Sequence, residues 1–596
     1  MAVSYQRNDR LIRRKFYQYL IPTVIMAMVM QLGSLADAIL IGNILGPDAL
    51  SASSLGLPVV FLVEVPGMAI SIGAAIVAAN FIGKRRVEEA SKVFKISLLM
   101  TFLLSLPFIP VGIFAAEPIS RLLAGNFPEL VPLITQYVRM YLCLGAVINL
   151  GLVIAYFLPS DNHPNLGAAY LIIASVIHIV ALVALSLPSS FSMEGRMAGA
   201  ASSFAIGMFA GFVVLIPYLR SKKRAINLKV SMKGSLKLLK GVLRSGSTNA
   251  AMVFLMFVNT LVINLAATQY LAAPDLPAFA MLNNFSFVID LFIIGPLQLM
   301  SSVIPALFGE KDYFGVKSVC RRVLTIVISI TVLLTAVSLI FPQMFFYIFN
   351  VEIASGTAID PLLVVRIFVL SFLLYVFIQF TTYYYPAIMV NSPGVVSNVA
   401  RVGAVGPVVL YFCMAASGVL GYAYGTIITN AAALLIVIVF LLIGKKLQRF
   451  KGKGLLLLPK AGEKGAYLDI SIPAKQEEIS KVSEELQRFA NESTHDEKSS
   501  AMLALACEEV MSNIIAYGYQ RKHSAEYIDL ALSQTEDRFL VRIRDDGIAF
   551  DPTEYVAEDG EEFQFHGIEV VRKVATEFKY LRVLNTNNTI MEIKIA

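Results

Sequence analysis

Twelve long apolar segments fill most of this 596-residue chain and constrain its fold more than any other feature. They follow one another between residues 21 and 443, separated by short polar connections. A helix needs about 20 mostly apolar residues to cross the hydrocarbon core of a bilayer, where each segment has to satisfy its own backbone hydrogen bonds. An all-α polytopic membrane domain is therefore predicted, with spans near residues 20–43, 52–80, 94–115, 131–157, 167–187, 197–218, 247–270, 277–307, 323–346, 362–388, 396–415 and 419–443.

The composition changes after Gly444, where charged residues begin to recur every few positions. The whole chain is only 15% charged, whereas a typical soluble domain is about 25% charged. A soluble domain is therefore expected after the membrane domain. We predict a membrane domain over residues 1–445, whose two lobes cover about 16–218 and 237–443, then a basic linker over 446–465 and a C-terminal domain over 466–596.

Lysine and arginine gather in alternate connections between the apolar segments. The N-terminal 7-RNDRLIRRK-15 and the later 445-KKLQRFKGK-453 are rich in these bases, whereas 43-NILGPDA-49 has none. Because short basic connections stay on the cytoplasmic side of a membrane, both termini are predicted to be cytoplasmic in a plasma-membrane protein. The net charge of +7 follows from this topology, so we expect the lipid bilayer as a partner and no nucleic acid.

The two halves of the membrane domain resemble each other at a spacing of 226 or 227 residues. Five pairs of similar residues recur in the same order, which indicates a duplication. Each half contains six predicted helices, and an even number keeps the halves parallel, so we expect two six-helix bundles with a substrate cavity between them. The pairs are Asp37 and Asn264, Glu64 and Asp290, Gly83 and Gly309, Arg139 and Arg366, and Pro159 and Pro386.

Two stretches of the first half carry a family resemblance. They are 37-DAILIGNILGPDALSASSLGLP-58 and 73-GAAIVAANFIGKRRVEEASKVF-94. Together with the number of spans and the repeat, they resemble the multidrug and toxic compound extrusion (MATE) transporters over about residues 10–445. The resemblance implies export of small molecules by alternating access, coupled to a gradient of protons or sodium ions.

Three acidic side chains fall inside the predicted spans, namely Asp37, Glu64 and Asp290. An acid at membrane depth costs about 2.5–3.5 kcal/mol on insertion scales, so it usually faces a cavity or a partner. Such a group can hold a proton, and when ionised it can hold a cation. Glu64 and Asp290 occupy matching places in the two halves. Either they line one central cavity and bind a cationic substrate, or each pairs with a nearby polar group.

The resemblance assigns cation coupling to Asp37. In the family, an Asn and an Asp four residues later on the fifth span complete the site, but this chain has His178 and Leu182 at those places. Sodium prefers several oxygen ligands, of which one is lost here, whereas an imidazole titrates near neutral pH. The sequence therefore favours an Asp37–His178 pair that exchanges protons, against the alternative that His178 hydrogen-bonds a backbone carbonyl.

The C-terminal domain shows the alternating pattern of strands and the wider spacing of helices. We predict strands over 467–472, 526–534 and 539–544, helices over 475–493 and 497–519, and a hairpin over 579–595. A sheet with helices on one face is the expected layer arrangement, so this domain is predicted to be a two-layer α/β domain.

Two motifs in this domain indicate nucleotide binding. Glu509 and Asn513 are four residues apart and share one face of the second predicted helix. Asp545 and Gly547 open the turn that follows the strand 539–544. Acidic and amide side chains beside a glycine turn resemble the GHKL ATP-binding fold, in its anti-sigma-factor serine-kinase branch.

That second resemblance covers about residues 466–596 and implies a role for each motif residue. Asn513 would hold Mg²⁺, Glu509 would act as the base, and Asp545 would read the adenine amino group of ATP. Gly547 would let the backbone approach the base. The resemblance thus also implies a serine-kinase activity toward a cytoplasmic protein partner.

A third motif departs from the family. The Gly-x-Gly run, whose amides cradle the phosphates, corresponds to 565-FHGIEVVRKV-574. Gly567 is retained as a nucleotide-binding residue, but Phe565 replaces the first glycine. We therefore expect an altered phosphate lid.

The sequence favours a cation-coupled antiporter that exports small cationic or amphipathic compounds and carries a regulatory ATP-binding module. No Gly-x-x-x-x-Gly-Lys-Ser/Thr loop is present, so ATP is not expected to power transport. Two other functions stay open: a membrane sensor whose tail is a signalling serine kinase, and a flippase for lipid-linked sugars. The intramembrane acids disfavour the flippase, which needs a basic cavity for phosphate groups.

Overall fold

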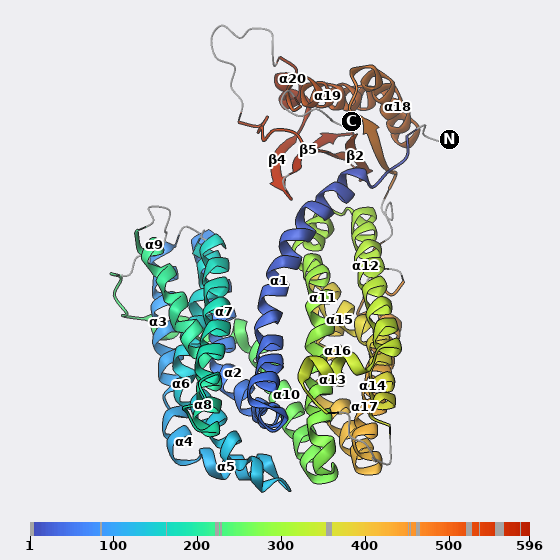
Figure 1. The fold of residues 1–596 in the computed structure, drawn as a ribbon. Helices are drawn as coiled ribbons and strands as arrows, with labels where there is room; N and C mark the ends of the chain where they lie inside the picture. Colours follow the sequence, from blue (N-terminus) through green and yellow to red (C-terminus); the bar gives the residue numbers. More distant parts are fainter. Residues whose placement is uncertain are drawn as a thin grey trace.

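The chain forms a helical part followed by a smaller α/β part. The helical part ends at Lys446 and the α/β part begins at Tyr467. Figure 1 shows the α/β part at the end of the helical part from which α1 (Arg10–Leu45) emerges. The computed structural model describes all residues except 1–4, 84–85, 162–163, 221–225, 227–228, 353–359, 451, 453, 460–464, 520–526, 536, 555–565, 585 and 596.

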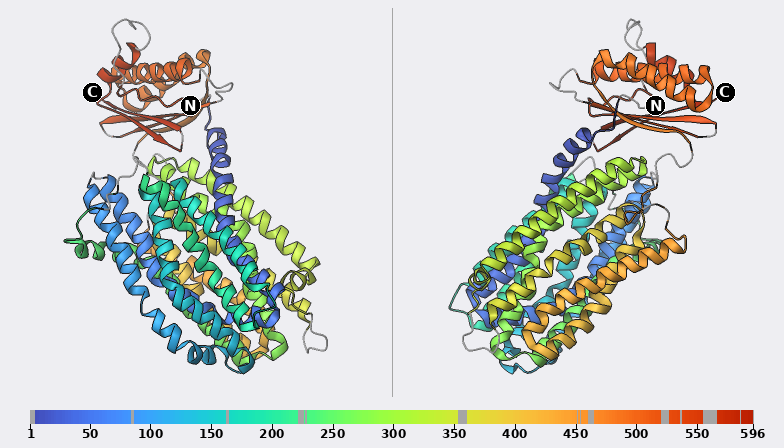
Figure 2. Two further views of the ribbon diagram at one scale, coloured as in Figure 1. Left: turned by 60° about the vertical axis from the view of Figure 1, so that its left-hand side comes forward. Right: turned by 90° about the vertical axis from the view of Figure 1, so that its right-hand side faces the viewer.

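The helices form two lobes that lie side by side (Figures 1 and 2). In the first lobe, α1 is followed by α2 (Pro47–Gly83), α3 (Val87–Ser105), α4 (Phe108–Phe114), α5 (Ala116–Ala124), η1 (Pro128–Leu130), α6 (Val131–Phe157), η2 (Leu158–Asp161), α7 (Pro164–Ser186), α8 (Met193–Gly211), η3 (Phe212–Val214) and α9 (Leu215–Arg220). The second lobe contains α10 (Ser235–Tyr270), η4 (Ala273–Asp275), α11 (Leu276–Gly309), α12 (Tyr313–Ile340), α13 (Gln343–Phe349), α14 (Pro361–Leu370), α15 (Phe372–Ala387), α16 (Asn391–Asn398), the π-helical segment η5 (Val399–Val405) and α17 (Gly406–Lys446).

Ten helices in the described part of the chain are long and apolar enough to cross a membrane. The last of them, Asn391–Lys446, contains two spans, because Ser417 and Gly418 have non-helical backbone angles. The chain folds back at this break, since a Cβ atom at Gly425 would lie 3.0 Å from Leu410. With α1 included, the helices therefore give the twelve segments that the sequence predicts.

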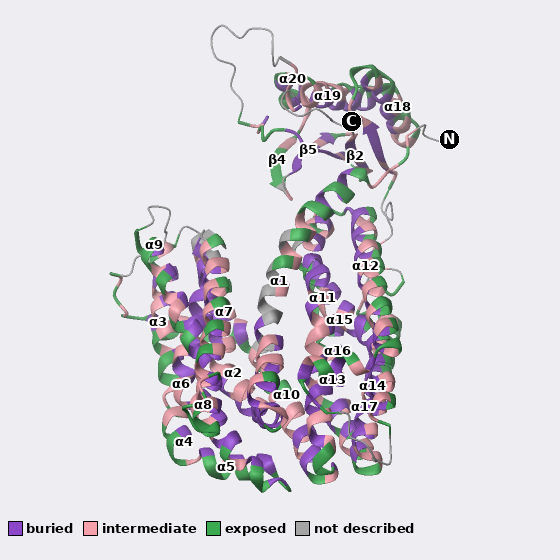
Figure 3. Ribbon diagram, viewed as in Figure 1, coloured by how far each residue is buried: buried purple, intermediate pink, exposed green. Residues whose placement is uncertain are grey.

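The outer faces of the helical part expose large apolar side chains. Leu333 and Ile340 of α12 are more than half exposed, as are Phe412 and Leu435 of α17. In Figure 3 the buried residues gather where helices face one another, and exposed residues follow their outer sides. Apolar surface of this extent is expected where helices contact lipid rather than water. The structure thus confirms an all-helical membrane domain.

Close backbone contact between α2 and α10 joins the two lobes. A Cβ atom at Gly246 would lie 1.7 Å from the carbonyl oxygen of Ala69, and one at Gly73 would lie 2.1 Å from the carbonyl oxygen of Val242. Small residues let membrane helices approach closely, and van der Waals contact then holds the helices together. These two glycines therefore set the spacing between the lobes.

The α/β part contains a five-stranded antiparallel sheet with the strand order β1-β2-β3-β5-β4. Helices cover one face of this sheet (Figure 2), and the predicted strands and helices are confirmed to within a few residues. The elements are β1 (Tyr467–Pro473), α18 (Gln476–Thr494), α19 (Glu497–Tyr517), β2 (Tyr527–Gln534), β3 (Arg538–Asp545), α20 (His566–Val574), β4 (Glu577–Val583) and β5 (Thr586–Lys594).

Alternation along the strands gives the sheet two different faces. Val541 and Ile543 of β3 are fully buried in the apolar core that the sheet forms with α18 and α19. The residues between and beside them point to the opposite face, where Arg542, Arg544 and Asp529 of β2 are also buried. Buried charges on the second face require partners, which the membrane domain provides.

We predict that Gly246→Ala destabilises the protein by about 1–3 kcal/mol, because the added methyl group has to displace the backbone of α2. The measurement is the unfolding temperature of the purified protein in detergent. Gly241→Ala on the same helix is the matched control, since nothing lies within 4 Å of its Cβ position. That control should leave the unfolding temperature unchanged or raise it, because alanine is the better helix former. Equal effects of the two substitutions would contradict the assigned role of the contact.

Candidate functional sites

A cavity of about 1260 Å³ lies in the first lobe and reaches its boundary with the second. The first lobe contributes Asp37 from α1, Glu64 from α2 and His178 from α7. From the second lobe, α11 contributes Asn284 and Phe287. Three of the four candidate coupling residues therefore meet in one cavity that both lobes line.

Asp37 and His178 form the pair that the sequence predicts. The Nε2 atom of His178 lies 2.8 Å from Oδ1 of Asp37, although the ring N–H is not aligned for a hydrogen bond. The imidazole is 3% exposed and the carboxylate 23% exposed, so the carboxylate is the more accessible member of the pair. Phe204 packs edge-on against the imidazole with ring centroids 5.3 Å apart. Leu182 is fully buried in the apolar core.

Asp290 lies apart from this group, in the second lobe. Its Oδ1 atom accepts a hydrogen bond of 2.8 Å from the hydroxyl of Tyr375 on α15. Glu64, by contrast, lines the cavity that contains Asp37. The sequence left two arrangements open for the matched acids, a cavity or a polar partner. Glu64 lines a cavity, whereas Asp290 pairs with a polar group.

A second pocket, of about 720 Å³, lies between α19 and the turn that follows β3. Asn513 and Asp545 line it together with apolar residues such as Ile548 and Phe550. An apolar slot with a few convergent polar groups is the usual form of a small-molecule site. The structure thus brings Asn513 and Asp545, two of the predicted nucleotide-binding residues, into one pocket.

Asp545 is held rigidly at the pocket floor. Its Oδ1 atom accepts hydrogen bonds from the amide of Gly547 at 2.7 Å and from Nδ2 of Asn587 at 2.8 Å. Burial raises the pKa of Asp545 to about 6, although these hydrogen bonds oppose the increase. A Cβ atom at Gly547 would lie 2.7 Å from the carbonyl oxygen of Gly518, so this turn requires glycine.

Glu509 and Gly567 lie in contact with each other but do not line this pocket, although their chain neighbours Val510 and Ile568 do. A Cβ atom at Gly567 would lie 1.9 Å from Oε2 of Glu509, so α20 begins directly against this carboxylate. Asn513 donates from Nδ2 to the carbonyl oxygen of Glu509 at 2.9 Å, which leaves its Oδ1 atom as the acceptor for a ligand. Phe565, which replaces the first glycine of the phosphate motif, lies outside the described residues.

The described residues contain no group of three or more His, Cys, Asp or Glu side chains that could hold a metal ion. A magnesium ion that is bound by one protein amide and by nucleotide phosphates needs no such group. The residues of the pocket therefore fit Mg²⁺ only as a partner of a phosphate-bearing ligand.

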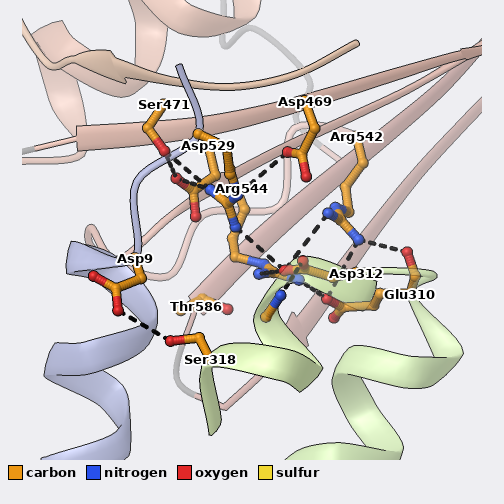
Figure 4. A network of polar contacts seen from close by, with 12 residues as sticks. Asp9, Glu310, Asp312, Ser318, Asp469, Ser471, Asp529, Arg542, Arg544 and Thr586 are labelled. Atoms are coloured by element: carbon orange, nitrogen blue, oxygen red, sulfur yellow. Dashed lines mark hydrogen bonds and ion pairs between the residues drawn. The ribbon is translucent and has the colours of Figure 1, made fainter. Parts of the chain in front are cut away.

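A buried network of charged residues joins the two domains (Figure 4). Arg542 and Arg544 project from β3 toward the connection between α11 and α12, which carries Glu310 and Asp312. Nη1 of Arg544 lies 2.7 Å from Oδ2 of Asp312, and Nη2 of Arg544 pairs with Glu310. Arg542 lies 3.8 Å from each of these carboxylates. The second face of the sheet is thus docked on the membrane domain by ion pairs.

Burial and the surrounding cations shift the pKa of Asp312 in opposite directions. Burial alone would raise the pKa of this carboxyl, but the guanidinium groups of Arg544, Arg7 and Arg542 outweigh it and hold the pKa of Asp312 well below its usual range. Asp312 therefore stays ionised at physiological pH and keeps its charge for the docking contact.

The segment before α1 belongs to the same network. Arg7 pairs with Asp529 and lies 3.3 Å from carboxylate oxygens of both Asp469 and Asp312. Burial raises the pKa of Asp469 to about 6, although Arg7 opposes the increase. Because Arg7 contacts acids of both domains, it bridges them directly.

The first turns of α1 also reach the turn that follows β3. Nη1 of Arg14 lies 3.1 Å from Oδ2 of Asp546, the residue that follows Asp545. Asp9 pairs with Arg322 of α12 and accepts a hydrogen bond from Ser318 at 3.0 Å. One end of α1 is therefore fixed to the second lobe and to the turn that follows β3, while its other half carries Asp37.

Neither this network nor Arg401 in the second lobe is predicted from the sequence. The members of the network are hundreds of positions apart, so no local pattern connects them, although two arginines separated by one residue in an apolar strand are an unusual signal. Arg401 gives a clearer signal, because it is a single base inside the apolar segment 396–415.

Comparisons with known proteins agree with both parts of the structure. A family model described as MatE matches residues 22–184, and one described as a histidine kinase-like ATPase domain matches residues 472–593. The chain contains a MATE domain joined to a C-terminal histidine kinase-like ATPase domain. This combination is the one that the two resemblances in the sequence imply.

Curated relatives match only a portion of the MATE domain. The chain is 25% identical over 241 residues to the probable multidrug resistance protein YoeA of Bacillus subtilis, covering 40% of this chain and 52% of that protein. It is 29% identical over 161 residues to an FAD transporter of Shewanella oneidensis, covering 27% of this chain and 35% of that protein. The matched regions thus span about half or less of these relatives.

Solved structures show the same fold over the whole MATE domain. An inward-facing multidrug resistance MATE family transporter of the MOP superfamily aligns with a TM-score of 0.63 and 20% identity, covering 73% of this chain and all of that chain. A MOP superfamily transporter from Pyrococcus furiosus with a binding pocket of reverse polarity aligns with a TM-score of 0.57 and 20% identity, covering 74% and 98%.

We predict that Arg544→Gln loosens the contact between the MATE and ATPase domains. The substitution leaves Glu310 and Asp312 buried without their nearest cation, which costs about 3–5 kcal/mol. Backbone amides of the α11–α12 connection and of β3 should then exchange with deuterium about tenfold faster or more. Arg538→Gln is the control on the same strand, because Arg538 is 46% exposed. Unchanged exchange in the Arg544 variant would show that the ion pairs do not hold the domains together.

Proposed function

We propose that the protein is a proton-coupled antiporter that exports small cationic or amphipathic compounds, and that its ATPase domain regulates transport. The observation that carries this proposal is the Asp37–His178 pair in a cavity lined by both lobes. A carboxylate that faces such a cavity can bind either a proton or a cationic cargo. Because one group serves both ligands, it exchanges one for the other.

The pair supports a simple sequence of proton steps. With Asp37 ionised, its carboxylate attracts a cation that enters the cavity. A proton that arrives from the other side of the membrane neutralises Asp37 and releases the cargo, and His178 can hold or pass this proton through Nε2 at 2.8 Å. Glu64 adds a second carboxylate to the same cavity. Sodium is the alternative coupling ion, but the histidine in place of an oxygen ligand favours the proton.

The basic connections support a plasma-membrane protein with both termini in the cytoplasm. The ATPase domain would then lie where ATP is plentiful. We propose that Asp545 accepts a hydrogen bond from the adenine amino group, that Oδ1 of Asn513 ligates Mg²⁺, and that the apolar slot of Ile548 and Phe550 encloses the base. The start of α20 at Gly567 would approach the phosphates.

The docking network supports a regulatory role for this domain. Arg544 and Asp545 are neighbours on β3, so one contacts the membrane domain while the other lines the nucleotide pocket. Arg14 connects the same turn to α1, which carries Asp37 in its other half. A nucleotide that shifts this turn would therefore bias the position of α1 and the balance between the states of the transporter. Under this scheme Glu509 contributes the base of a serine-kinase reaction on a cytoplasmic partner.

The same contacts favour one second candidate, a membrane sensor. Coupling between two sites is reciprocal, so a ligand in the membrane cavity would change the nucleotide pocket as much as the reverse. In a sensor, cargo would stimulate phosphorylation of a partner protein without net transport. Transport measurements distinguish the two functions.

We predict that Asp37→Asn abolishes gradient-driven transport in proteoliposomes, because the amide cannot take up and release the proton. The assay follows a cationic dye under an imposed proton gradient and, separately, an imposed sodium gradient. Asp275→Asn is the control, since Asp275 lies in the short turn η4, away from the Asp37 cavity. Undiminished proton-driven transport by the Asp37 variant would remove Asp37 from the mechanism, and dependence on sodium alone would overturn proton coupling.

We predict that nucleotide binding weakens as the pH falls through about 6. Burial raises the pKa of Asp545 to about 6, so the carboxylate is ionised at pH 7.5 and mostly protonated at pH 5.5. Loss of the ionised acceptor should reduce affinity for ATP by about fourfold over this range. The measurement is isothermal titration calorimetry on the full chain.

Asp545→Asn is the control for this titration. Protonation of the nucleotide phosphates affects both proteins equally, so the pH dependence that wild type shows and the variant lacks belongs to Asp545. Equal pH dependence in the two proteins would contradict the adenine contact. In proteoliposomes, enclosed ATP should change the transport rate of wild type and leave that of the variant unchanged.

A further inference from the structure

A cavity of about 580 Å³ in the second lobe is lined by one cationic side chain among the described residues. Residues of α10, α11, α14, α15, η5 and α17 line it, and Arg401 is the one charged residue among those described in its lining. The remaining lining combines aromatic rings with hydroxyl and amide groups. The first-lobe cavity is acidic by comparison, so the two lobes present opposite charges.

Arg401 lies inside a helix that is long and apolar enough to cross a membrane. It is ten residues from Asn391, where its span begins, and the span ends at the break at Ser417. At 1.5 Å per residue, Arg401 lies about 15 Å along the helix from Asn391. A charged side chain inside such a span is costly and usually marks the path of a substrate or ion.

The contacts of Arg401 orient its guanidinium group without a direct ion pair among the described residues. Nε donates a hydrogen bond of 3.1 Å to Oδ1 of Asn430, and the group lies 4.5 Å from the ring centroid of Tyr375. Among the described residues, no carboxylate oxygen lies within 4.0 Å of a guanidinium nitrogen of Arg401, the distance that defines an ion pair. Asp290 interacts electrostatically with Arg401, and its Oδ1 atom accepts a hydrogen bond of 2.8 Å from the hydroxyl of the same Tyr375.

The local backbone supports this placement. Arg401 lies in η5, a π-helical segment, and such segments occur frequently at functional sites. The widened turn requires glycine at position 406, since a Cβ atom there would lie 2.1 Å from the carbonyl oxygen of Arg401. A second polar group shares the cavity lining: Oγ1 of Thr429 is buried without a hydrogen-bond partner, and the residue is 4% exposed. The hydroxyl is therefore available to a ligand.

We propose that Arg401 binds the carboxylate group of an amphipathic cargo, with Thr429 as a further donor. A guanidinium group presents two parallel donors that match the two oxygens of a carboxylate, which a point charge cannot do. Aromatic rings of Phe372, Tyr375 and Tyr422 would enclose the apolar body of such a compound. The inference rests on the proposed function only in assuming that the cavities hold cargo, and it extends the cargo class to compounds that carry a carboxylate.

A matched pair of fluorescent dyes tests this site directly. Rhodamine 110 carries a free carboxylate, and rhodamine 123 is its methyl ester. Binding of each dye to the purified full chain is measured by fluorescence anisotropy without any gradient. Arg401→Gln should weaken the binding of rhodamine 110 by about tenfold or more, because a charged hydrogen bond is lost, and should leave rhodamine 123 unchanged. Arg366→Gln is the control in the same lobe, since Arg366 donates to the carbonyl oxygen of Leu339 at 3.1 Å.

Each other result contradicts the proposal. Equal weakening of both dyes by Arg401→Gln would assign Arg401 a structural role, and no saturable binding of rhodamine 110 to wild type would remove the site. Displacement of rhodamine 110 by inorganic phosphate but not by benzoate would assign the cavity to phosphate groups instead. Because the assay measures binding alone, undiminished transport by the Asp37→Asn protein with this binding pattern intact would overturn the proposed coupling and leave the Arg401 site standing.

Discussion

The cost of placing a charge in hydrocarbon governs the arrangement of this membrane domain. Its outer faces are apolar, and Asp37, Glu64, Asp290 and Arg401 each line a cavity or contact a polar partner. Asp37 faces a cavity and lies beside His178, Asp290 accepts a hydrogen bond from the hydroxyl of Tyr375, and Arg401 stacks on the ring of Tyr375. The fold thus places these charges in the interior of each lobe.

The cost of burying charge also applies where the ATPase domain contacts the membrane domain, but there the buried charges form the contact. A sheet usually packs an apolar face on its neighbour, but the second face of this sheet carries buried arginines and acids. Ion pairs of this kind contribute specificity more than stability, because desolvation offsets most of their attraction. They fix which strand faces the membrane domain. As a result, β3 presents Arg544 to the α11–α12 connection and Asp545 to the nucleotide pocket.

Local patterns in the sequence predict most of the fold. Long apolar runs specify the helices, and alternation specifies the strands, because both patterns repeat over many neighbouring residues. The residues of the two sites were predicted from resemblance to families, and the structure brings Asp37 close to His178 and Asn513 into one pocket with Asp545. Their roles stay proposals. The position of Asp290 could not be decided, because a buried acid is compatible with a cavity or with a partner until Tyr375 is placed beside it.

The beginning of the chain is part of the contact between domains. Tyr5 donates to Glu478 of α18, and the carbonyl oxygen of Gln6 accepts a hydrogen bond of 3.4 Å from the amide of Ser471 on β1. A purification tag or fluorescent protein fused before Tyr5 would therefore emerge beside the sheet and could pull this segment out of place. Such a fusion is a poor choice for preparing the intact protein, but a small environment-sensitive label there would report directly on whether the two domains are together.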